Sequence, residues 1–278
     1  MTVYDTLEKR HVMPRAWEDW AAYRSAWSTW ILRHCEPGSS LLIVGAGACN
    51  DYDLKHLLTF FDHITLYDVD VKSMQEALRR VSETDRTRIT CVVGDLLGIT
   101  PEEYREFCTV IQNEVNRRGK LTDITQLAQT ALTLAQSMYA RAAGRRDKLT
   151  LPRADAVAVS GVHSQINHML PWIWEAYMQV LGQREDQVFQ MISQENSRIA
   201  AQVNEQLCKA ADKGLLVSAE ASRAGVAGSV EGAWQALTDL KQRTDPSELH
   251  VTDTAHLAWG YDLRQNMIYD MEALALMR

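Results

Sequence analysis

The sequence predicts an α/β fold in which parallel strands alternate with helices. Two short apolar runs, residues 41–44 and 64–67, have the length and composition that are typical of buried strands, and a third lies within RITCVVGDL at 88–96. Apolar residues at helical spacing follow the first run, and a similar pattern at 74–81 follows the second. Strands and helices that alternate at this spacing form βαβ units, which place their strands parallel in one sheet.

Composition limits the class of protein. The chain has 278 residues, of which 46% are hydrophobic and 23% are charged, as is typical of a folded globular domain with insertions. We find neither an apolar run long enough to span a membrane nor a secretory signal, so we expect a cytoplasmic protein. Five cysteines without a CxxC pair argue against a disulfide framework. The net charge of -7 disfavours a nucleic-acid partner, because proteins that neutralise many phosphates are usually basic.

Residues 1–38 are predicted to form an N-terminal helical cover. Within 15–34, large apolar side chains recur at helical spacing and so share one face: Trp20, Tyr23, Trp27, Trp30 and Ile31. Pro37 and Gly38 then end the helix. Two interpretations are open, since the aromatic face either packs on the core or forms a lid over a ligand.

Residues 39–278 are predicted to form the α/β domain, with a helical insertion at about 101–148 that contains two helical patterns. The elements that we expect after the insertion are a strand at 154–160, an apolar helix from near Asn167, a polar helix at about 184–213, a strand at 214–221, a strand at 249–259, and a last strand or helix at 266–276.

Three predicted strands end in residues that suit a ligand. Gly45 and Gly47 lie between a strand and a helix, where small residues let the backbone and free N–H groups approach an anion. Asp68 ends the next strand, where a carboxylate can accept both hydroxyls of an adenosine ribose. Gly94 and Asp95 close the third strand at the same edge of the sheet. Asp68 and its neighbour Asp70 have a simpler alternative role, namely capping the following helix.

These segments resemble the class I S-adenosylmethionine-dependent methyltransferases. The matching motifs are VGAGACN, LYDVD, VVGDL and DAVAVSGVHS, and the resemblance covers about residues 39–100 well and 150–278 in general layout. The resemblance implies a Rossmann-like, mostly parallel seven-stranded sheet with a reversed last strand and helices on both faces. It also implies that S-adenosylmethionine lies over the first three strand ends, with the substrate near the fourth.

The resemblance implies roles for individual residues. Gly45 and Gly47 would line the methionine part of the cofactor, Asp68 would hold the ribose, and Asp95 and Leu96 would contact the adenine. Ile43 stands where the family often has an acidic residue, and Cys49 replaces the third glycine. Asp51 or Asp53 would then hold the cofactor's ammonium, although Asn50 and Asp51 are also plausible helix caps. The cofactor-binding positions that we expect are Gly45, Ala46, Gly47, Asp51, Asp68, Val69, Asp95, Leu96 and Ser160.

Methyl transfer requires alignment of the reacting atoms and, for some acceptors, a base. His163 follows the fourth strand and is the predicted base, with Ser164, Gln165 and Asn167 as polar neighbours. The alternative is that His163 caps the next helix or bonds within its loop. We expect no metal, because no carboxylate stands at the exit of the fourth strand and the histidines lack ligand spacing.

The insertion carries more basic than acidic residues, with eight Lys and Arg against six Asp and Glu over residues 101–150. It either docks an anionic partner or is a solvated helical pair. We therefore expect an S-adenosylmethionine-dependent methyltransferase with a small-molecule substrate and no membrane partner. The alternatives are a protein or RNA methyltransferase that docks through the insertion, and a non-catalytic protein that binds an adenosyl ligand. A nucleic-acid partner is disfavoured. A dinucleotide dehydrogenase is disfavoured further, because Asn50 stands where the fingerprint of that class has glycine. The sequence does not decide whether the protein forms a homo-oligomer.

Overall fold

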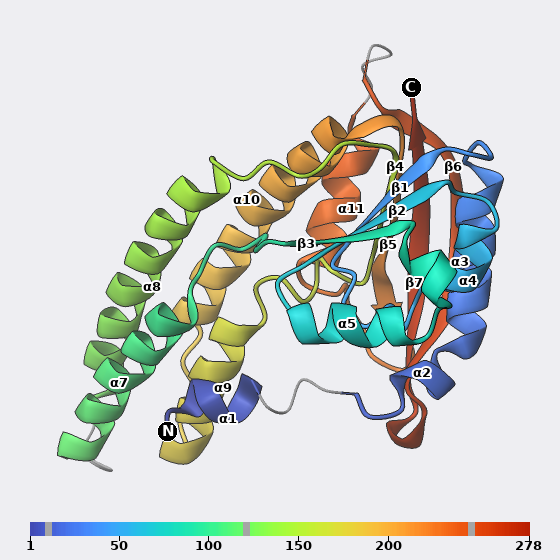
Figure 1. The fold of residues 1–278 in the computed structure, drawn as a ribbon. Helices are drawn as coiled ribbons and strands as arrows, with labels where there is room; N and C mark the ends of the chain where they lie inside the picture. Colours follow the sequence, from blue (N-terminus) through green and yellow to red (C-terminus); the bar gives the residue numbers. More distant parts are fainter. Residues whose placement is uncertain (9–12, 119–122, 244–247) are drawn as a thin grey trace. The chain divides into compact units, whose positions relative to one another are not determined.

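The computed structural model describes residues 1–8, 13–118, 123–243 and 248–278 (Figure 1). The chain divides into two compact units. We call residues 14–95, 150–164 and 200–278 the sheet unit, and residues 1–13, 96–149 and 165–199 the helical unit.

The sheet unit contains seven strands in the order β3-β2-β1-β4-β5-β7-β6. Strands β1 to β5 pair in parallel, whereas β7 is antiparallel to both β5 and β6. The predicted α/β fold, with a mostly parallel sheet and a reversed last strand, is therefore confirmed. The strands are β1 (Ser40–Val44), β2 (His63–Asp68), β3 (Ile89–Val93), β4 (Ala154–Ser160), β5 (Ala211–Arg223), β6 (His250–Asp262) and β7 (Met267–Met277).

Helices cover both faces of this sheet. In Figure 1, α3 (Ala21–Arg33) and α4 (Leu54–Leu58) lie on one side of the strands, and α11 (Ala233–Lys241) lies on the other. The face toward α3 carries small side chains, among them Ala156, Ala158 and Ala273, in one core cluster with the large rings of α3. Small strand residues leave room for these rings, which bury a large apolar area.

The aromatic N-terminal segment packs on the core, as the first of its two interpretations expects. Trp27 and Ile31 are fully buried in the cluster, and Trp30 is nearly so. The single helix predicted over 15–34 is wrong in one respect, because the chain forms α2 (Ala16–Asp19) and α3 with a break at Trp20. The indole nitrogen of Trp20 donates to the carbonyl oxygen of Tyr261 at 3.0 Å, a contact that no local pattern reveals.

Two other helices in this region begin at aspartates. The Asp53 side chain accepts from the backbone N–H of His56 and begins α4, so the predicted caps Asn50 and Asp51 are wrong. Asp70 caps α5 (Val71–Arg79) by accepting from the N–H groups of Lys72 and Ser73, as its alternative role expects. A short helix, α6 (Glu83–Arg86), was not predicted.

The C-terminal segment 266–276, predicted as a strand or a helix, is strand β7, and β6 and β7 form a long antiparallel pair. The polar helix predicted at about 184–213 is α10 (Gln187–Ala210), and β5 follows it directly. Neither α11 nor α1 (Val3–Glu8) was predicted.

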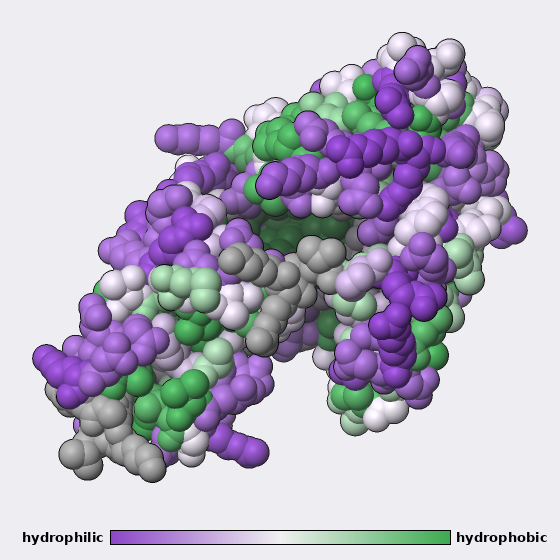
Figure 2. Space-filling model, turned by 60° about the horizontal axis from the view of Figure 1, so that its bottom comes forward, coloured by the Kyte–Doolittle hydropathy of each residue, from purple (hydrophilic) through white to green (hydrophobic). Residues whose placement is uncertain are grey.

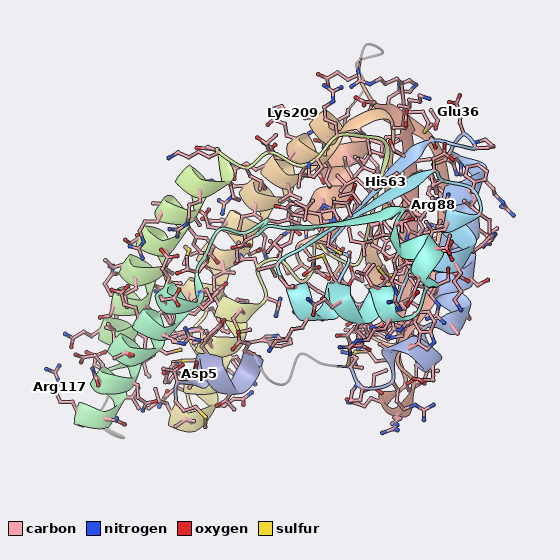
Figure 3. All side chains as sticks on the ribbon, viewed as in Figure 1. Asp5, Glu36, His63, Arg88, Arg117 and Lys209 are labelled. Atoms are coloured by element: carbon pink, nitrogen blue, oxygen red, sulfur yellow. The ribbon has the colours of Figure 1, made fainter. Side chains whose placement is uncertain are left out.

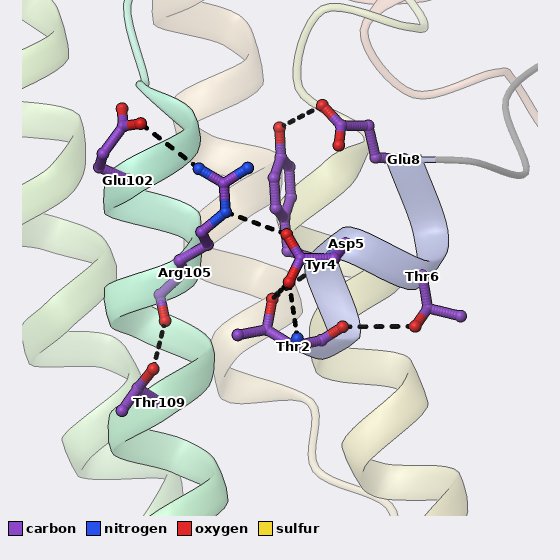
Figure 4. A network of polar contacts seen from close by, with 8 residues as sticks. All are labelled: Thr2, Tyr4, Asp5, Thr6, Glu8, Glu102, Arg105 and Thr109. Atoms are coloured by element: carbon purple, nitrogen blue, oxygen red, sulfur yellow. Dashed lines mark hydrogen bonds and ion pairs between the residues drawn. The ribbon is translucent and has the colours of Figure 1, made fainter.

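The helical unit contains α1, α7 (Pro101–Arg118), α8 (Ile124–Arg146), α9 (Met169–Leu181) and the first part of α10. Arg105 of α7 joins α1 to α7, because its Nε lies 3.0 Å from the Asp5 carboxylate and its guanidinium lies over the Tyr4 ring (Figure 4). Tyr4 also stacks on Tyr104, with ring centroids 5.1 Å apart. An ion pair between half-exposed side chains adds little stability, so the stacked rings contribute more to this contact.

The basic residues of α7 and α8 have acidic neighbours within the same unit. Glu103 accepts hydrogen bonds from both Arg141 and Arg145. Arg117, labelled in Figure 3, pairs with Glu114 at 2.7 Å, and Arg146 is buried and donates to the carbonyl of Leu97. Lys120, counted with the basic residues of the insertion, lies outside the described residues.

Hydrophilic side chains cover most of the surface in the view of Figure 2, with smaller apolar areas between them. None of the helices described is long and apolar enough to cross a membrane.

Candidate functional site

The loop after β1 is held in a conformation that suits glycine. Gly45 and Gly47 have φ angles of 69° and 47°, in the left-handed region. The N–H groups of Gly45 and Ala46 both donate to the carbonyl oxygen of Tyr67 on β2, at 2.9 and 3.2 Å. No described atom lies within 4 Å of the point that a Cβ of Gly47 would occupy. The space beside Gly47 is therefore open.

Gly45 cannot be enlarged without a clash, and the substitution Gly45→Ala tests this. The added Cβ would lie 2.2 Å from Cγ2 of Val162, and the positive φ adds strain of its own. We expect a loss of about 2–5 kcal/mol in the free energy of unfolding, measured by urea denaturation. Gly47→Ala is the matched control: it shares the backbone strain but has no neighbour to strike, so its loss should be smaller by at least about 1 kcal/mol. Equal losses would contradict the close contact with Val162.

Asp68 ties the end of β2 to this loop. Its Oδ2 accepts from the N–H of Gly47 and its Oδ1 accepts from the N–H of Asp70, both at 2.8 Å. Burial raises the pKa of this carboxyl, and the two backbone hydrogen bonds oppose that shift. The N-cap of α5 is Asp70 and not Asp68. Val69 beside it is 65% exposed, although it is apolar.

The end of β3 lies against the same strand. The N–H of Gly94 donates to the carbonyl of Asp68 at 3.1 Å, and a Cβ on Gly94 would overlap the Tyr67 hydroxyl. That hydroxyl is buried and has no hydrogen-bond partner among the described residues. Burial, followed by the charges of Asp95 and Asp68, raises the pKa of Tyr67 to about 12. The charges of Asp68 and Asp95 therefore both act on one phenol at the carboxyl edge of the sheet.

Asp95 itself is exposed, and the first segment of the sheet unit ends there. Leu96 begins the next segment of the helical unit and is buried.

Asp51 is a buried acidic group of this edge. Burial raises its pKa to about 7, and a hydrogen bond with Ser160 at the end of β4 opposes the shift. The Ser160 hydroxyl lies 2.8 Å from the Tyr23 hydroxyl, which donates to Ser218 on β5. The loop after β1, the ends of β4 and β5, and α3 therefore meet at one polar chain.

His163 is buried beyond the end of β4. Its Nε2 lies 2.9 Å from the side-chain oxygen of Asn204, whose nitrogen donates to the carbonyl of Ala236 and to Asp239. The Nε2 must therefore carry the proton, and Nδ1 has no partner among the described residues. Burial lowers the pKa of His163 to about 4. The imidazole is thus neutral at pH 7, and it bonds to α10 rather than within its own loop.

The polar neighbours predicted for His163 divide between the units. Ser164 is in the sheet unit and donates to Glu220 at 2.6 Å, while Asn167 is in the helical unit and accepts from Tyr139. Gln165 is exposed at the start of the helical unit's next segment.

Sequence reasoning missed Tyr23, Ser218 and Glu220 as parts of this edge. The sequence predicts Tyr23 as one ring of the aromatic face, which either packs on the core or covers a ligand, and gives its hydroxyl no role. A charged residue inside the apolar run GLLVSAEA was a usable signal for Glu220, because strands rarely bury a carboxylate without a reason.

A cavity of about 390 Å³ lies elsewhere in the sheet unit, and its lining includes Trp17, Cys49, Tyr52 and Arg80. Its lining includes Asp53, the alternative ammonium position, and none of the other predicted cofactor positions. The guanidinium groups of Arg24 and Arg80 lie over the Trp17 ring and donate to backbone carbonyls of the glycine loop, so they support that loop. Among the described residues, no group of three or more His, Cys, Asp or Glu is arranged to hold a metal.

Comparison with known proteins finds similarity in structure only. No protein-family model matches the chain, and no curated protein matches its sequence. A protein from Pyrococcus horikoshii described as a candidate RNA methyltransferase is 11% identical, with a TM-score of 0.46 over 99% of this chain and 96% of its own.

Two other similar solved structures are also described as methyltransferases. Magnesium protoporphyrin IX methyltransferase from Synechocystis PCC 6803, with bound S-adenosylmethionine, is 11% identical, with a TM-score of 0.45 over 100% of this chain and 92% of its own. A S-adenosylmethionine-dependent methyltransferase from Aquifex aeolicus is 9% identical, with a TM-score of 0.45 over 100% and 99%. The seven strands and the reversal of β7 agree with the mostly parallel sheet with a reversed last strand that the sequence resemblance implies.

Proposed function

We propose that this protein is a methyltransferase that uses S-adenosylmethionine and acts on a small molecule. One observation carries the proposal: the Asp68 carboxylate binds the Gly47 N–H at the carboxyl edge of a parallel sheet, beside the end of β3 that carries Asp95. This is the edge at which open α/β sheets bind nucleosides.

The residues at this edge fit an adenosyl ligand with an ammonium group. The space beside Gly47 is open, the Tyr67 hydroxyl is buried and unpartnered among the described residues, and Val69 offers an exposed apolar surface. We assign Asp68 to the ribose, Val69 and Asp95 to the adenine, and Asp51 to the ammonium. Gly45, Ala46, Gly47 and Ser160 complete the site around the methionine part.

Bound S-adenosylmethionine supplies a methyl group on a positively charged sulfur. The protein's own contribution is to orient the acceptor and to exclude water. We assign the base role to His163, which is neutral and has a bare Nδ1 that can take a proton. Its low pKa makes it a weak base, so it suits an acceptor whose proton is already acidic.

A small-molecule acceptor is favoured over a macromolecule. The chain has a net charge of -7, and the basic side chains of α7 and α8 that the structure describes pair largely with Glu103 and Glu114. Charges paired in this way attract phosphates less than free ones do.

Calorimetric titration with S-adenosylhomocysteine, the product of methyl transfer, tests the proposal. We expect binding at one site per chain, with a dissociation constant in the range of about 1–100 μM. Incubation with methyl-labelled S-adenosylmethionine and a cell extract should then label the small-molecule fraction. Failure to bind would overturn the proposal, binding without any transfer would identify a non-catalytic protein, and label in the RNA or protein fraction would identify a macromolecular substrate.

A further inference from the structure

A buried carboxylate in the sheet unit has an oxygen without a hydrogen-bond partner. Glu220 lies near the end of β5, and its side chain is 4% exposed. Its Oε1 accepts from the Ser164 hydroxyl at 2.6 Å, whereas Oε2 has no partner among the residues that the structure describes. Burial raises the pKa of this carboxyl. A buried oxygen of this kind is costly unless a ligand or an ion contacts it.

Aromatic side chains lie on the same face of the sheet as Glu220. Glu220 is opposite Met271 in the β5–β7 pair, and Tyr269 is two residues from Met271, so all three side chains share a face. Trp259 of β6 is opposite Tyr269 and shares this face too. The aromatic cluster consists of five rings in mutual contact, with centroids 4.8 to 6.0 Å apart: Trp20, Tyr23, Trp259, Tyr261 and Tyr269.

The charge of Glu220 acts on this cluster. Burial raises the pKa of Tyr23, Tyr261 and Tyr269, and the negative charge of Glu220 adds to each shift, as does that of Asp51 at Tyr23 and that of Asp262 at Tyr261. The Nε1 atom of Trp259 is also buried without a partner among the described residues. A carboxylate and the faces of aromatic rings both attract cations, and they do so more strongly where water is excluded.

We propose that Glu220 and the aromatic cluster bind the ammonium group of the methyl acceptor, which is therefore a small molecule that carries a cationic amine. The inference rests on the proposed function, since it names the substrate class for that site. Tyr23 connects the two places, because it belongs to the cluster and its hydroxyl contacts Ser160, the partner of Asp51. The ammonium of the acceptor would neutralise Glu220, whose charge acts on Tyr23, Tyr261 and Tyr269.

Choline and its neutral isostere 3,3-dimethylbutan-1-ol are probes of equal shape that differ in charge. We expect calorimetric titration of the protein to show binding of choline, with the neutral alcohol at least about tenfold weaker. In Glu220→Gln, choline should lose at least about tenfold in affinity, because the amide keeps the shape and removes the charge. Glu272→Gln is the matched control: Glu272 is opposite Ala219, so it points to the other face of the sheet, where it pairs with Lys241, and choline affinity should not change.

Tyr261→Leu provides a second variant, which keeps the carboxylate and removes one ring, and which should weaken choline binding by about threefold to tenfold. Equal binding of the two probes, no binding of choline, or full affinity in Glu220→Gln would each overturn the ammonium site. Titration of the same samples with S-adenosylhomocysteine separates the two proposals. If S-adenosylhomocysteine binds and choline does not, only the ammonium site is overturned. If choline binds and S-adenosylhomocysteine does not, the proposed function is overturned, and with it the identification of the amine as a methyl acceptor.

Discussion

Replacing Asp51 with asparagine should make the unliganded protein more stable and weaken its binding of S-adenosylhomocysteine at the same time. The folded-state pKa of Asp51 is about 7, against 3.8 for an ordinary aspartate. Between these values the unfolded chain loses its proton before the folded one, so this group's contribution to stability falls as the pH rises from about 4 to about 7. Asparagine stays neutral. The gain should be about 2–4 kcal/mol at pH 8 and roughly half of that at pH 5, measured by urea denaturation.

The same substitution removes the charge that we assign to the ligand's ammonium. We expect S-adenosylhomocysteine to bind at least about tenfold more weakly to Asp51→Asn. Asp53→Asn is the matched control, because Asp53 begins α4 as its cap and asparagine caps a helix equally well. Neither stability nor affinity should change much in that variant. If Asp53→Asn, and not Asp51→Asn, weakened binding, the ammonium contact would belong to Asp53.

The second large effect is expected at Asp68. Its carboxylate would accept both ribose hydroxyls, and each charge-assisted hydrogen bond contributes about 1.5–3 kcal/mol, so Asp68→Ala should lower the affinity for S-adenosylhomocysteine by at least about 100-fold. The variant also loses the hydrogen bond that fixes Gly47. The rise in melting temperature that saturating S-adenosylmethionine gives the wild type should accordingly disappear.

Asp70→Asn controls for a general disturbance of this turn. Asp70 lies two residues away and caps α5, a role that asparagine retains. It should bind S-adenosylhomocysteine as the wild type does. If Asp68→Ala bound S-adenosylhomocysteine with wild-type affinity, Asp68 would not contact the ribose. If both variants lost affinity equally, the conformation of the turn, and not the Asp68 carboxylate, would determine binding.

The central strands could be predicted because their signals are local. Leu41–Val44 and Ala154–Ser160 are apolar runs bounded by glycines and polar residues, and both form parallel strands. The reversal of β7 came only from the resemblance and the order of the strands was not predicted, since pairing between distant segments leaves no local trace. For 266–276 the pattern fitted a strand or a helix, and pairing with β5 and β6 decided between them.

The site was predictable in part for the same reason. The glycine loop and Asp68 are marked by their position after buried strands. The contact between Tyr23 and Ser160 joins residues 137 positions apart, so nothing near either residue announces it. The helix cap was misassigned because three candidates within four residues, Asn50, Asp51 and Asp53, precede α4. Tertiary contacts decided among them, since Asp51 is buried against Ser160.

A crystal structure of the complex with S-adenosylhomocysteine tests the central claim most directly. The account predicts one ligand at the carboxyl edge of the sheet, with its ribose hydroxyls donating to Asp68, its adenine beside Asp95, and its ammonium at Asp51. A ligand bound elsewhere, for example in the cavity beside Trp17, with no contact to Asp68 or Asp95, would contradict it.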